Sequence, residues 1–519
     1  MMRLSRSSGS LFAWLALALC GSASVAFPAT RPNIVLFLAD DLGQRDLGCY
    51  GSTFYETPNL DRMAREGARF TDAYAACPVC SPTRASILSG QWPQRTGITD
   101  YIGAPATPEQ WKRNTKSLPA PYVDRLALGS PTIAKALKAA GYATFFAGKW
   151  HLGPEGWWPE NQGFDINMGG IDRGGPYGGK RYFSPYGNPR LKDGPEGEHL
   201  PDRLAIETTK FIEANKDRSF FAFFSCYSVH TPLMAREDLR KKYEAKRERL
   251  GLAERWGREQ ERDVRLVQEH AVYAGMVEAL DLAVGKVLAK LDELGLRENT
   301  LVVFTSDNGG LSTSEGWPTS NSPLRAGKGW IYEGGIREPL IVRWPAHVKP
   351  GIVVSTPVSS PDFFPTFLEA AGAGTPAGGG ASAHSGAVMD GRSLLPLLKG
   401  GSGPERSLFW HYPHYGNQGG APAAAIRSGH WKLIEWFEDG RLELFNLMSD
   451  PGEQTDLASR EPRVVERLRG ELLAWQRQVG AKMPVPNPHY DPNQPSGRAA
   501  NRQPTAPPAP SQAPARKIN

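Results

Sequence analysis

The amino-acid sequence predicts an α/β fold: a mostly parallel central sheet sandwiched by helices, followed by a smaller C-terminal α+β part with an antiparallel sheet and a helix. Continuous apolar runs are typical of strands buried on both faces of a parallel sheet. They occur at residues 33–39, 143–147, 220–224 and 301–305. Helical segments lie between them, as at 130–140 and 272–294. Strands that alternate with helices indicate a parallel sheet covered on both faces.

The C-terminal part is predicted from a change in this pattern. Alternating apolar and polar residues at 431–434 and 443–446 are typical of antiparallel strands. A helix follows, and its apolar side chains share one face. These are Val465, Leu468, Leu472, Trp475 and Val479. The low-complexity stretch 372–387 predicts a flexible loop near the boundary between the two parts.

Polar residues follow each apolar run, at the carboxyl end of the predicted strand. They are Asp40 and Asp41, Lys149 and His151, His230, and Asp307 and Asn308. In open α/β sheets, ligands bind beyond the carboxyl ends of the strands. These side chains are therefore candidates for one shared site, although they are far apart in the sequence.

The acidic residues and the asparagine in this set suggest a metal. Three carboxylates and an amide oxygen, from Asp40, Asp41, Asp307 and Asn308, suit a hard divalent cation such as Ca²⁺ or Mg²⁺. Aspartate and asparagine at strand ends also cap turns without any metal. Either pair alone favours the capping interpretation, whereas both pairs at one sheet edge favour a metal site.

A short cysteine motif, CPVCSPTR at residues 77–84, indicates the reacting group. A redox pair or half a zinc site is the alternative, but zinc would need further cysteine or histidine ligands at the right spacing. Pro82 suits the first turn of a helix, so Cys80 is expected at a helix N-terminus, where free N–H groups favour an anion. Arg84, four residues on, is expected on the same face and within reach of position 80. The motif therefore predicts a site for an anionic ester.

The run from Cys80 to Arg84 resembles the sulfatase signature C-x-P-x-R, and Gly148–Gly153 (GKWHLG) resembles the second signature of that family. The resemblance continues through Asp40-Asp41, His230, Ser306–Gly309, Gly327–Trp330, Glu333–Arg337 and 444–451, and covers about residues 32–480. It implies an alkaline-phosphatase-like fold and similarity to formylglycine-dependent arylsulfatases and N-acetylgalactosamine-6-sulfatases.

The resemblance also implies a role for each residue. A formylglycine-generating maturation enzyme would oxidise Cys80 to an aldehyde, which hydrates to a gem-diol and attacks sulfur. Ca²⁺, with Mg²⁺ as the alternative, would be held by Asp40, Asp41, Asp307, Asn308 and the modified Cys80. Arg84 would hold the second hydroxyl, Lys149 and Lys328 would neutralise the sulfate oxygens, His230 would protonate the leaving alcohol, and His151 would take the proton that re-forms the aldehyde.

The expected function is therefore hydrolysis of sulfate from a sulfated carbohydrate or a small aryl sulfate. Two alternatives remain open. One is a phosphonate or phosphate monoester hydrolase of the same superfamily. The other is a sulfated-glycan binding protein without turnover, if Cys80 stays a thiol. The 60 Lys+Arg against 54 Asp+Glu leave a thinly spread net charge of +6, which argues against a nucleic-acid binder. Five cysteines in 519 residues are too few for a disulfide framework.

The N-terminus predicts export. A basic start, a short apolar run and small residues before Phe27 are typical of a signal peptide, residues 1–26. We expect a periplasmic or extracellular protein with no integral membrane segment after cleavage. The predicted domains are the sulfatase catalytic domain at 27–385, the C-terminal subdomain at 386–483, and a Pro-rich, disordered tail at 484–519.

Overall fold

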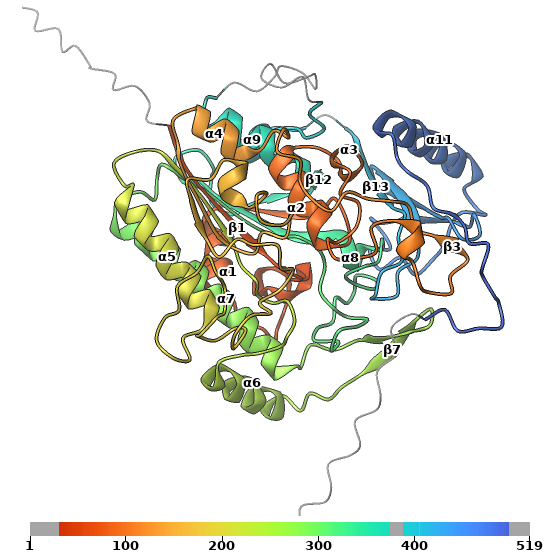
Figure 1. Ribbon diagram of the computed structural model, residues 1–519, viewed down its shortest axis with the longest axis horizontal. Coiled ribbons are helices and arrows are strands. Elements are labelled where there is room, and N and C mark those ends of the chain that lie inside the picture. Colours follow the sequence, from red (N-terminus) through yellow and green to blue (C-terminus); the bar gives the residue numbers. More distant parts are fainter. Residues whose placement is uncertain (1–30, 374–387, 404, 498–519) are drawn as a thin grey trace, which may run out of the picture. The chain divides into compact units, whose positions relative to one another are not determined.

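The computed structural model describes residues 31–373, 388–403 and 405–497 (Figure 1). The predicted signal peptide, the predicted domain boundary at 385, most of the predicted loop 372–387 and the tail from 498 lie outside the described residues. The described residues belong to one compact unit. Among the described residues, no helix combines the length and the apolar character needed to cross a bilayer.

A nine-stranded sheet forms the centre, in the order β11-β2-β10-β9-β1-β6-β4-β5, with β12 paired to β2. Its strands are β1 (Asn33–Ala39), β2 (Ala68–Tyr74), β4 (Ala143–Gly148), β5 (Ile166–Met168), β6 (Phe220–Ser225), β9 (Thr300–Ser306), β10 (Arg337–Arg343), β11 (Ile352–Val354) and β12 (Val358–Ser359). Strands β9, β1, β6, β4 and β5 run parallel, and β10 is antiparallel to both its neighbours. The predicted mostly parallel sheet is confirmed.

Helices cover both faces of this sheet (Figure 1). On one face lie α1 (Pro58–Glu66), α5 (Leu200–Ala214), α6 (Glu237–Arg249) and α7 (Ala271–Glu293), and on the other α2 (Cys80–Ser89), α4 (Ile133–Ala139) and α9 (Phe363–Ala370). Successive side chains of a strand point to opposite faces. Accordingly, Val35 and Phe37 of β1 enter the first core, while Leu36 and Leu38 enter the second. This explains why β1 is apolar throughout.

The C-terminal part is a four-stranded antiparallel sheet covered by one helix, as predicted. Its elements are β13 (Ser407–Tyr412), β14 (Ala423–Ser428), β15 (Trp431–Trp436), β16 (Leu442–Asn446) and α11 (Pro462–Val479). Leu468, Leu472 and Trp475 of α11 are buried. They share a core with Trp330 and Tyr332, which precede β10, and with Tyr74 of β2, so the small sheet packs on the central one.

A buried ion network joins the small sheet to the segment that precedes β10. Lys432 of β15 donates to Glu333 at 3.0 Å and lies 2.8 Å from Glu453, and all three side chains are fully buried. Breaking a buried pair by removing one partner costs about 3–5 kcal/mol, because a charge is left without compensation. We expect Lys432→Met to lower the free energy of unfolding in urea by about this amount.

The matched control is the exposed pair of Arg467 and Glu471, 2.8 Å apart, where Arg467 is 50% exposed. Arg467→Met should change the free energy of unfolding by less than about 1 kcal/mol. Equal effects of the two substitutions would contradict a stabilising role of the buried network.

Residues 484–497, within the segment predicted to be disordered, have regular contacts in the structure. Val485–Pro486 form β17, antiparallel to β3 (Ser117–Leu118). The backbone N–H of Asn487 donates to the Lys116 carbonyl at 2.9 Å, and Asn114 Nδ2 donates to the Asp491 carbonyl at 2.7 Å. The difference arises because these side-chain and backbone pairings depend on segment 114–118, which composition does not reveal.

Candidate active site

The carboxyl ends of four adjacent parallel strands form the floor of the site. Strands β9, β1, β6 and β4 are neighbours in this order. The residues that follow them are the ones singled out in the sequence, and all are buried: Asp307 and Asn308 after β9, Asp40 and Asp41 after β1, His230 after β6, and Lys149 and His151 after β4. The parallel pairing explains why residues distant in the sequence meet at one edge.

Helix α2 brings Cys80 to this edge. Cys80 is the first residue of α2, as expected, and Val79 before it is extended. All ten residues of α2 are buried, so the helix N-terminus is fixed within the core. Arg84 of α2 points to the acidic side of the site: its Nε donates to Asp307 Oδ2 at 2.8 Å, and its Nη1 donates to the Lys149 carbonyl at 2.9 Å.

The four predicted oxygen donors lie against one another. The Asp41 N–H donates to Asp307 Oδ1 at 3.2 Å, and Asn308 Nδ2 donates to Asp41 Oδ1 at 2.8 Å. Arg84 Nη2 lies 2.7 Å from Asp307 and 3.7 Å from Asp40, which connects the two strand ends. Asn308 Oδ1 is buried and has no hydrogen-bond partner among the described residues. This oxygen is therefore free to bind an additional group.

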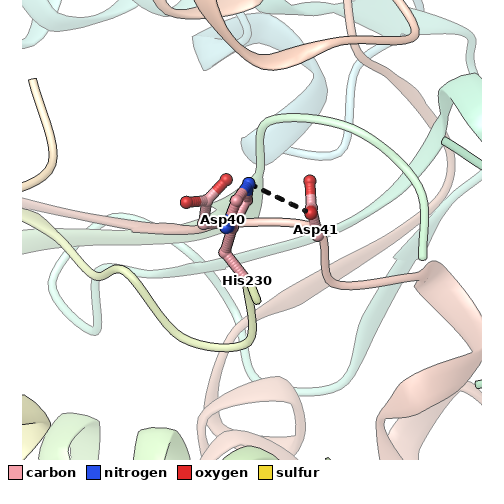
Figure 2. Close-up of side chains that lie close together, drawn as sticks. All are labelled: Asp40, Asp41 and His230. Carbon is pink, nitrogen blue, oxygen red and sulfur yellow. Dashed lines mark ion pairs between the residues drawn. The ribbon is translucent and has the colours of Figure 1, made fainter. Parts of the chain in front are cut away.

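His230 lies beside Asp40 and Asp41, the two aspartates that follow β1 (Figure 2). Ligand atoms of Asp40, Asp41 and His230 all lie within 4.8 Å of one another. His230 Nδ1 contacts the Thr231 carbonyl at 2.7 Å, and a carbonyl only accepts, so Nδ1 carries the proton. Nε2 then faces Asp41 Oδ2 at 3.7 Å, the contact drawn in Figure 2. Burial and Lys328 lower the pKa of His230 well below its ordinary value, and Asp41 opposes this shift.

Two lysines compensate the carboxylates. Lys149 Nζ donates to both oxygens of Asp40, at 2.9 and 2.8 Å, and Lys328 Nζ donates to Asp41 at 2.8 Å. Burial alone would lower the pKa of each lysine, but Asp40 raises that of Lys149 and Asp41 raises that of Lys328 above its ordinary value. Both lysines are therefore ammonium ions inside the protein.

His151 lies beside Cys80 in a defined tautomer. Its Nε2 contacts the Ile102 carbonyl at 2.7 Å, so Nε2 carries the proton. Its Nδ1 lies 3.4 Å from Cys80 Sγ and 3.2 Å from Ser81 Oγ. Burial and the nearby Lys149 ammonium lower the pKa of His151 well below its ordinary value. The ring is thus neutral and presents a proton acceptor to position 80.

A pocket of about 290 Å³ opens onto these groups. Four of the predicted residues line it: Cys80, His151, His230 and Lys328. The others lie beneath it and are at most 2% exposed: Asp40, Asp41, Arg84, Lys149, Asp307 and Asn308. Cavities of about 400 and 500 Å³ elsewhere contain none of the predicted residues, so chemistry rather than size identifies the site.

Sequence reasoning missed part of the pocket lining. The missed polar residues are Tyr101, Tyr177, Glu315, Asn417 and Gln418. The last two lie in GNQGG, a glycine-rich loop between β13 and β14 that composition marks as a turn. Tyr101, Tyr177 and Glu315 lie in loops with no periodic pattern, so only the folded chain brings them to the site.

Comparison with known proteins agrees with this geometry. Residues 32–373, more than half of the chain, match the family model Sulfatase. The chain belongs to the sulfatase family. A second model, N-sulphoglucosamine sulphohydrolase C-terminal, matches residues 326–478. The resemblance inferred from the two signatures is confirmed, and the protein is an enzyme that hydrolyses sulfate esters.

Individual relatives cover most of this sulfatase. A sulfatase from Formosa agariphila is 33% identical, over 86% of this chain and 88% of that protein. Arylsulfatase A from Homo sapiens is 32% identical, over 90% of this chain and 91% of that protein. The structure of Ps i-CgsB in complex with k-i-k-neocarrahexaose is similar with a TM-score of 0.69 and 29% identity, covering 86% of this chain and 93% of that one.

Proposed function

We propose that this sulfatase removes sulfate from a sulfated carbohydrate, using a formylglycine made from Cys80 and a divalent cation at the ends of β1 and β9. The observation that carries the proposal is the environment of Cys80. It lies at the N-terminus of α2 in a pocket of about 290 Å³, with the acceptor nitrogen of His151 3.4 Å from its sulfur. This combines a nucleophile position, a base and a positive helix end.

The donor set fits a hard cation. Asp40, Asp41 and Asp307 supply carboxylate oxygens, and Asn308 supplies the buried Oδ1 that lacks a partner among the described residues. Leaving such an acceptor unsatisfied costs about 1–3 kcal/mol, which a bound cation would offset. We propose Ca²⁺, with Mg²⁺ as the alternative. When present, the cation and the hydrated formylglycine supply an activated oxygen nucleophile for attack on sulfur.

Two histidines transfer protons during the reaction. His151 Nδ1 accepts a proton from the side chain at position 80, and the Ile102 carbonyl stabilises the Nε2–H on the other side of the ring. His230 keeps its Nδ1–H on the Thr231 carbonyl, so a second proton on Nε2 is the one delivered to the leaving alcohol. Burial and Lys328 disfavour that imidazolium, and Asp41, 3.7 Å from Nε2, stabilises it when the proton is transferred.

The positive charges of Lys328, Lys149 and Arg84 stabilise the charge that develops on the sulfate group. Lys328 lines the pocket directly, whereas Lys149 and Arg84 lie beneath it and act from behind the acidic residues. We therefore propose Lys328 as the direct sulfate ligand. The contacts of Lys149 and Arg84 favour a supporting role over the direct contacts that the resemblance implies. Arg84 contributes by orienting Asp307, to which it donates at 2.8 Å.

A carbohydrate substrate is supported by two aromatic side chains of the pocket. Tyr101 and Tyr177 line it, and aromatic rings with a hydroxyl combine apolar and polar contacts for a sugar. The similar structure of Ps i-CgsB binds an oligosaccharide, k-i-k-neocarrahexaose. Export by the predicted signal peptide, to the periplasm or the medium, would bring the enzyme to such substrates. A maturation enzyme is the required partner for the change at Cys80.

Hydrolysis of phosphonate or phosphate monoesters, and glycan binding without turnover, are less favoured because the matched family model and the named relatives are sulfatases. Rates on 4-nitrophenyl sulfate and 4-nitrophenyl phosphate test the first alternative, and a clear preference for phosphate would refute our proposal. The mass of the peptide containing Cys80 tests the second. We expect the lower mass of the aldehyde; an unmodified thiol in fully active protein would refute the mechanism.

We expect His151→Ala to lower kcat on 4-nitrophenyl sulfate by about 10²- to 10⁴-fold, the usual contribution of general acid–base catalysis. The reason is the loss of the acceptor nitrogen beside Cys80. His489→Ala, at an exposed histidine, is the matched control and should leave kcat unchanged. A kcat within a few-fold of wild type for His151→Ala would contradict the assigned role.

A further inference from the structure

Four polar side chains that have no role in the proposed chemistry line the same pocket as Cys80. They are Tyr101, Glu315, Asn417 and Gln418, which we call the polar wall. They form two hydrogen-bonded pairs. Asn417 Nδ2 donates to the Tyr101 hydroxyl at 3.1 Å, and Gln418 Nε2 donates to Glu315 Oε1 at 2.5 Å. The wall therefore presents hydroxyl, amide and carboxylate groups to whatever occupies the pocket.

Glu315 gives this wall a negative charge. Within the described part of the chain, its hydrogen bond comes from the neutral Gln418, and it forms no ion pair. Glu315 lines the same pocket as Lys328, the lysine of the proposed sulfate site. An additional carboxylate repels an anionic ester and does not stabilise its transition state. The negative charge of Glu315 therefore has a role other than catalysis.

The backbone holds Glu315 in place. Glu315, Gly316 and Trp317 have φ values of +51°, +92° and +45°, and non-glycine residues rarely adopt such values. The hairpin of β7 (Trp256–Glu259) and β8 (Arg262–Arg265) anchors this turn: Trp317 Nε1 donates to the Asp263 carbonyl at 3.0 Å, and Arg265 donates to the Trp317 carbonyl. Unusual backbone conformations of this kind concentrate at ligand-binding positions.

Gln418 provides an acceptor next to the carboxylate. The side chain is 3% exposed, and its Oε1 has no hydrogen-bond partner among the described residues. The Gln418 backbone carbonyl accepts from Trp330 Nε1 at 3.0 Å, which fixes the loop that carries it. A buried acceptor without a partner is satisfied by a donor on a ligand. Together with Glu315, it makes this side of the pocket rich in acceptors.

We propose that the polar wall selects a sugar ring that carries hydroxyl groups and a single sulfate, and that it rejects a ring with a carboxylate or a second sulfate. Ring hydroxyls donate to Glu315 and Gln418, and a hydroxyl bonded to a carboxylate forms a strong, charge-assisted bond. A second anionic group in the same ring is repelled by Glu315, and specificity commonly rests on such repulsion of the wrong partner. The inference rests on the proposed function and adds to it the class of sugar.

The test compares wild type with Glu315→Gln, which keeps the shape and removes the charge. The substrates are galactose 4-sulfate, galactose 6-sulfate and galactose 4,6-disulfate, and the readout is the ratio of kcat/KM for mono- and disulfated sugars. We expect wild type to prefer a monosulfated sugar and Glu315→Gln to lose about tenfold or more of that preference, the effect of one nearby charge. The wild-type preference should also weaken at high salt, because screening acts on partly exposed charges.

The matched control is Glu213→Gln, an exposed glutamate of α5, which should keep the wild-type ratio. An unchanged ratio in Glu315→Gln, or a wild type that prefers the disulfated sugar, would overturn the inference. Calorimetric binding of the same sugars to Cys80→Ala and to Cys80→Ala/Glu315→Gln separates selection from turnover. If wild type hydrolyses none of these sugars, their binding preference still decides the role of the wall, and absence of any binding refutes it. Failure of the proposed function is read separately, from the rate on 4-nitrophenyl sulfate and the mass of the peptide containing Cys80.

Discussion

Cys80→Ala is expected to lower kcat on 4-nitrophenyl sulfate by about 10⁴- to 10⁶-fold, because an enzyme that loses its nucleophile keeps only the rate given by binding and electrostatics. Alanine fits at this position without disturbing the helix, since Cys80 begins α2 and the helix contacts of the backbone are kept. The protein should therefore fold normally, which circular dichroism and thermal unfolding would check. The remaining His151, His230 and Lys328 would still line the pocket.

The control for this substitution is Cys77→Ala. Cys77 belongs to the same CxxC motif and is equally buried, at 3% exposed, but it packs with Val79 and Tyr412 outside the pocket lining. We expect Cys77→Ala to retain wild-type turnover and Cys80→Ala to lose it. Similar losses in both variants would instead favour a redox pair, and a nearly normal kcat in Cys80→Ala would refute the nucleophile assignment.

Removal of divalent cations by EDTA is expected to reduce hydrolysis to background, and added Ca²⁺ is expected to restore it. Asn308→Ala should weaken Ca²⁺ binding by at least the 10- to 100-fold that loss of an outer-shell partner costs at metal sites. The physical reason is the loss of the buried Oδ1 that has no partner among the described residues. Calorimetric titration with Ca²⁺ measures this affinity without requiring activity.

A second readout is stability. A ligand that binds only the folded protein stabilises it by about 2.7 kcal/mol at 100 times its dissociation constant. Wild type should unfold at a higher temperature in Ca²⁺ than in EDTA, and Asn308→Ala should show a smaller shift at the same concentration. Asn161→Ala, at an exposed asparagine, should behave as wild type. Unfolding that is independent of Ca²⁺, together with full activity in EDTA, would exclude the cation site.

The central sheet and the residues at its edge could be predicted from sequence because their signals are local. A strand buried on both faces is continuously apolar, and β1 has the predicted bounds, Asn33–Ala39. The polar residues after each strand meet because parallel strands end at one edge. Spacing on α2 also predicts Arg84 beside the strand-end residues, where the structure has it, but the spacing does not predict its partner. A long side chain follows the nearest charge, here Asp307 at 2.8 Å, rather than the residue one turn before it.

The pocket wall could not be predicted because its parts come from three distant segments. Tyr101, Glu315 and Gln418 meet only after the C-terminal sheet packs on the central one. The contacts of residues 484–497 were missed for a similar reason, since Asn114 and Asn487 pair with backbone groups on the other segment. Such contacts depend on tertiary packing, and no periodicity or composition in either segment alone indicates them.

The position of the loop between β13 and β14 bears on how enzymes with this architecture diversify. It brings Asn417 and Gln418 to the pocket, while the reacting groups come from the central sheet and α2. The Gly416 N–H donates to the Gly420 carbonyl at 3.0 Å and closes a tight turn. This short turn is carried by the small sheet and not by the central one. Exchange of this turn would alter the pocket wall and leave Cys80, His151 and His230 in place, so substrate range and catalytic power are able to evolve separately.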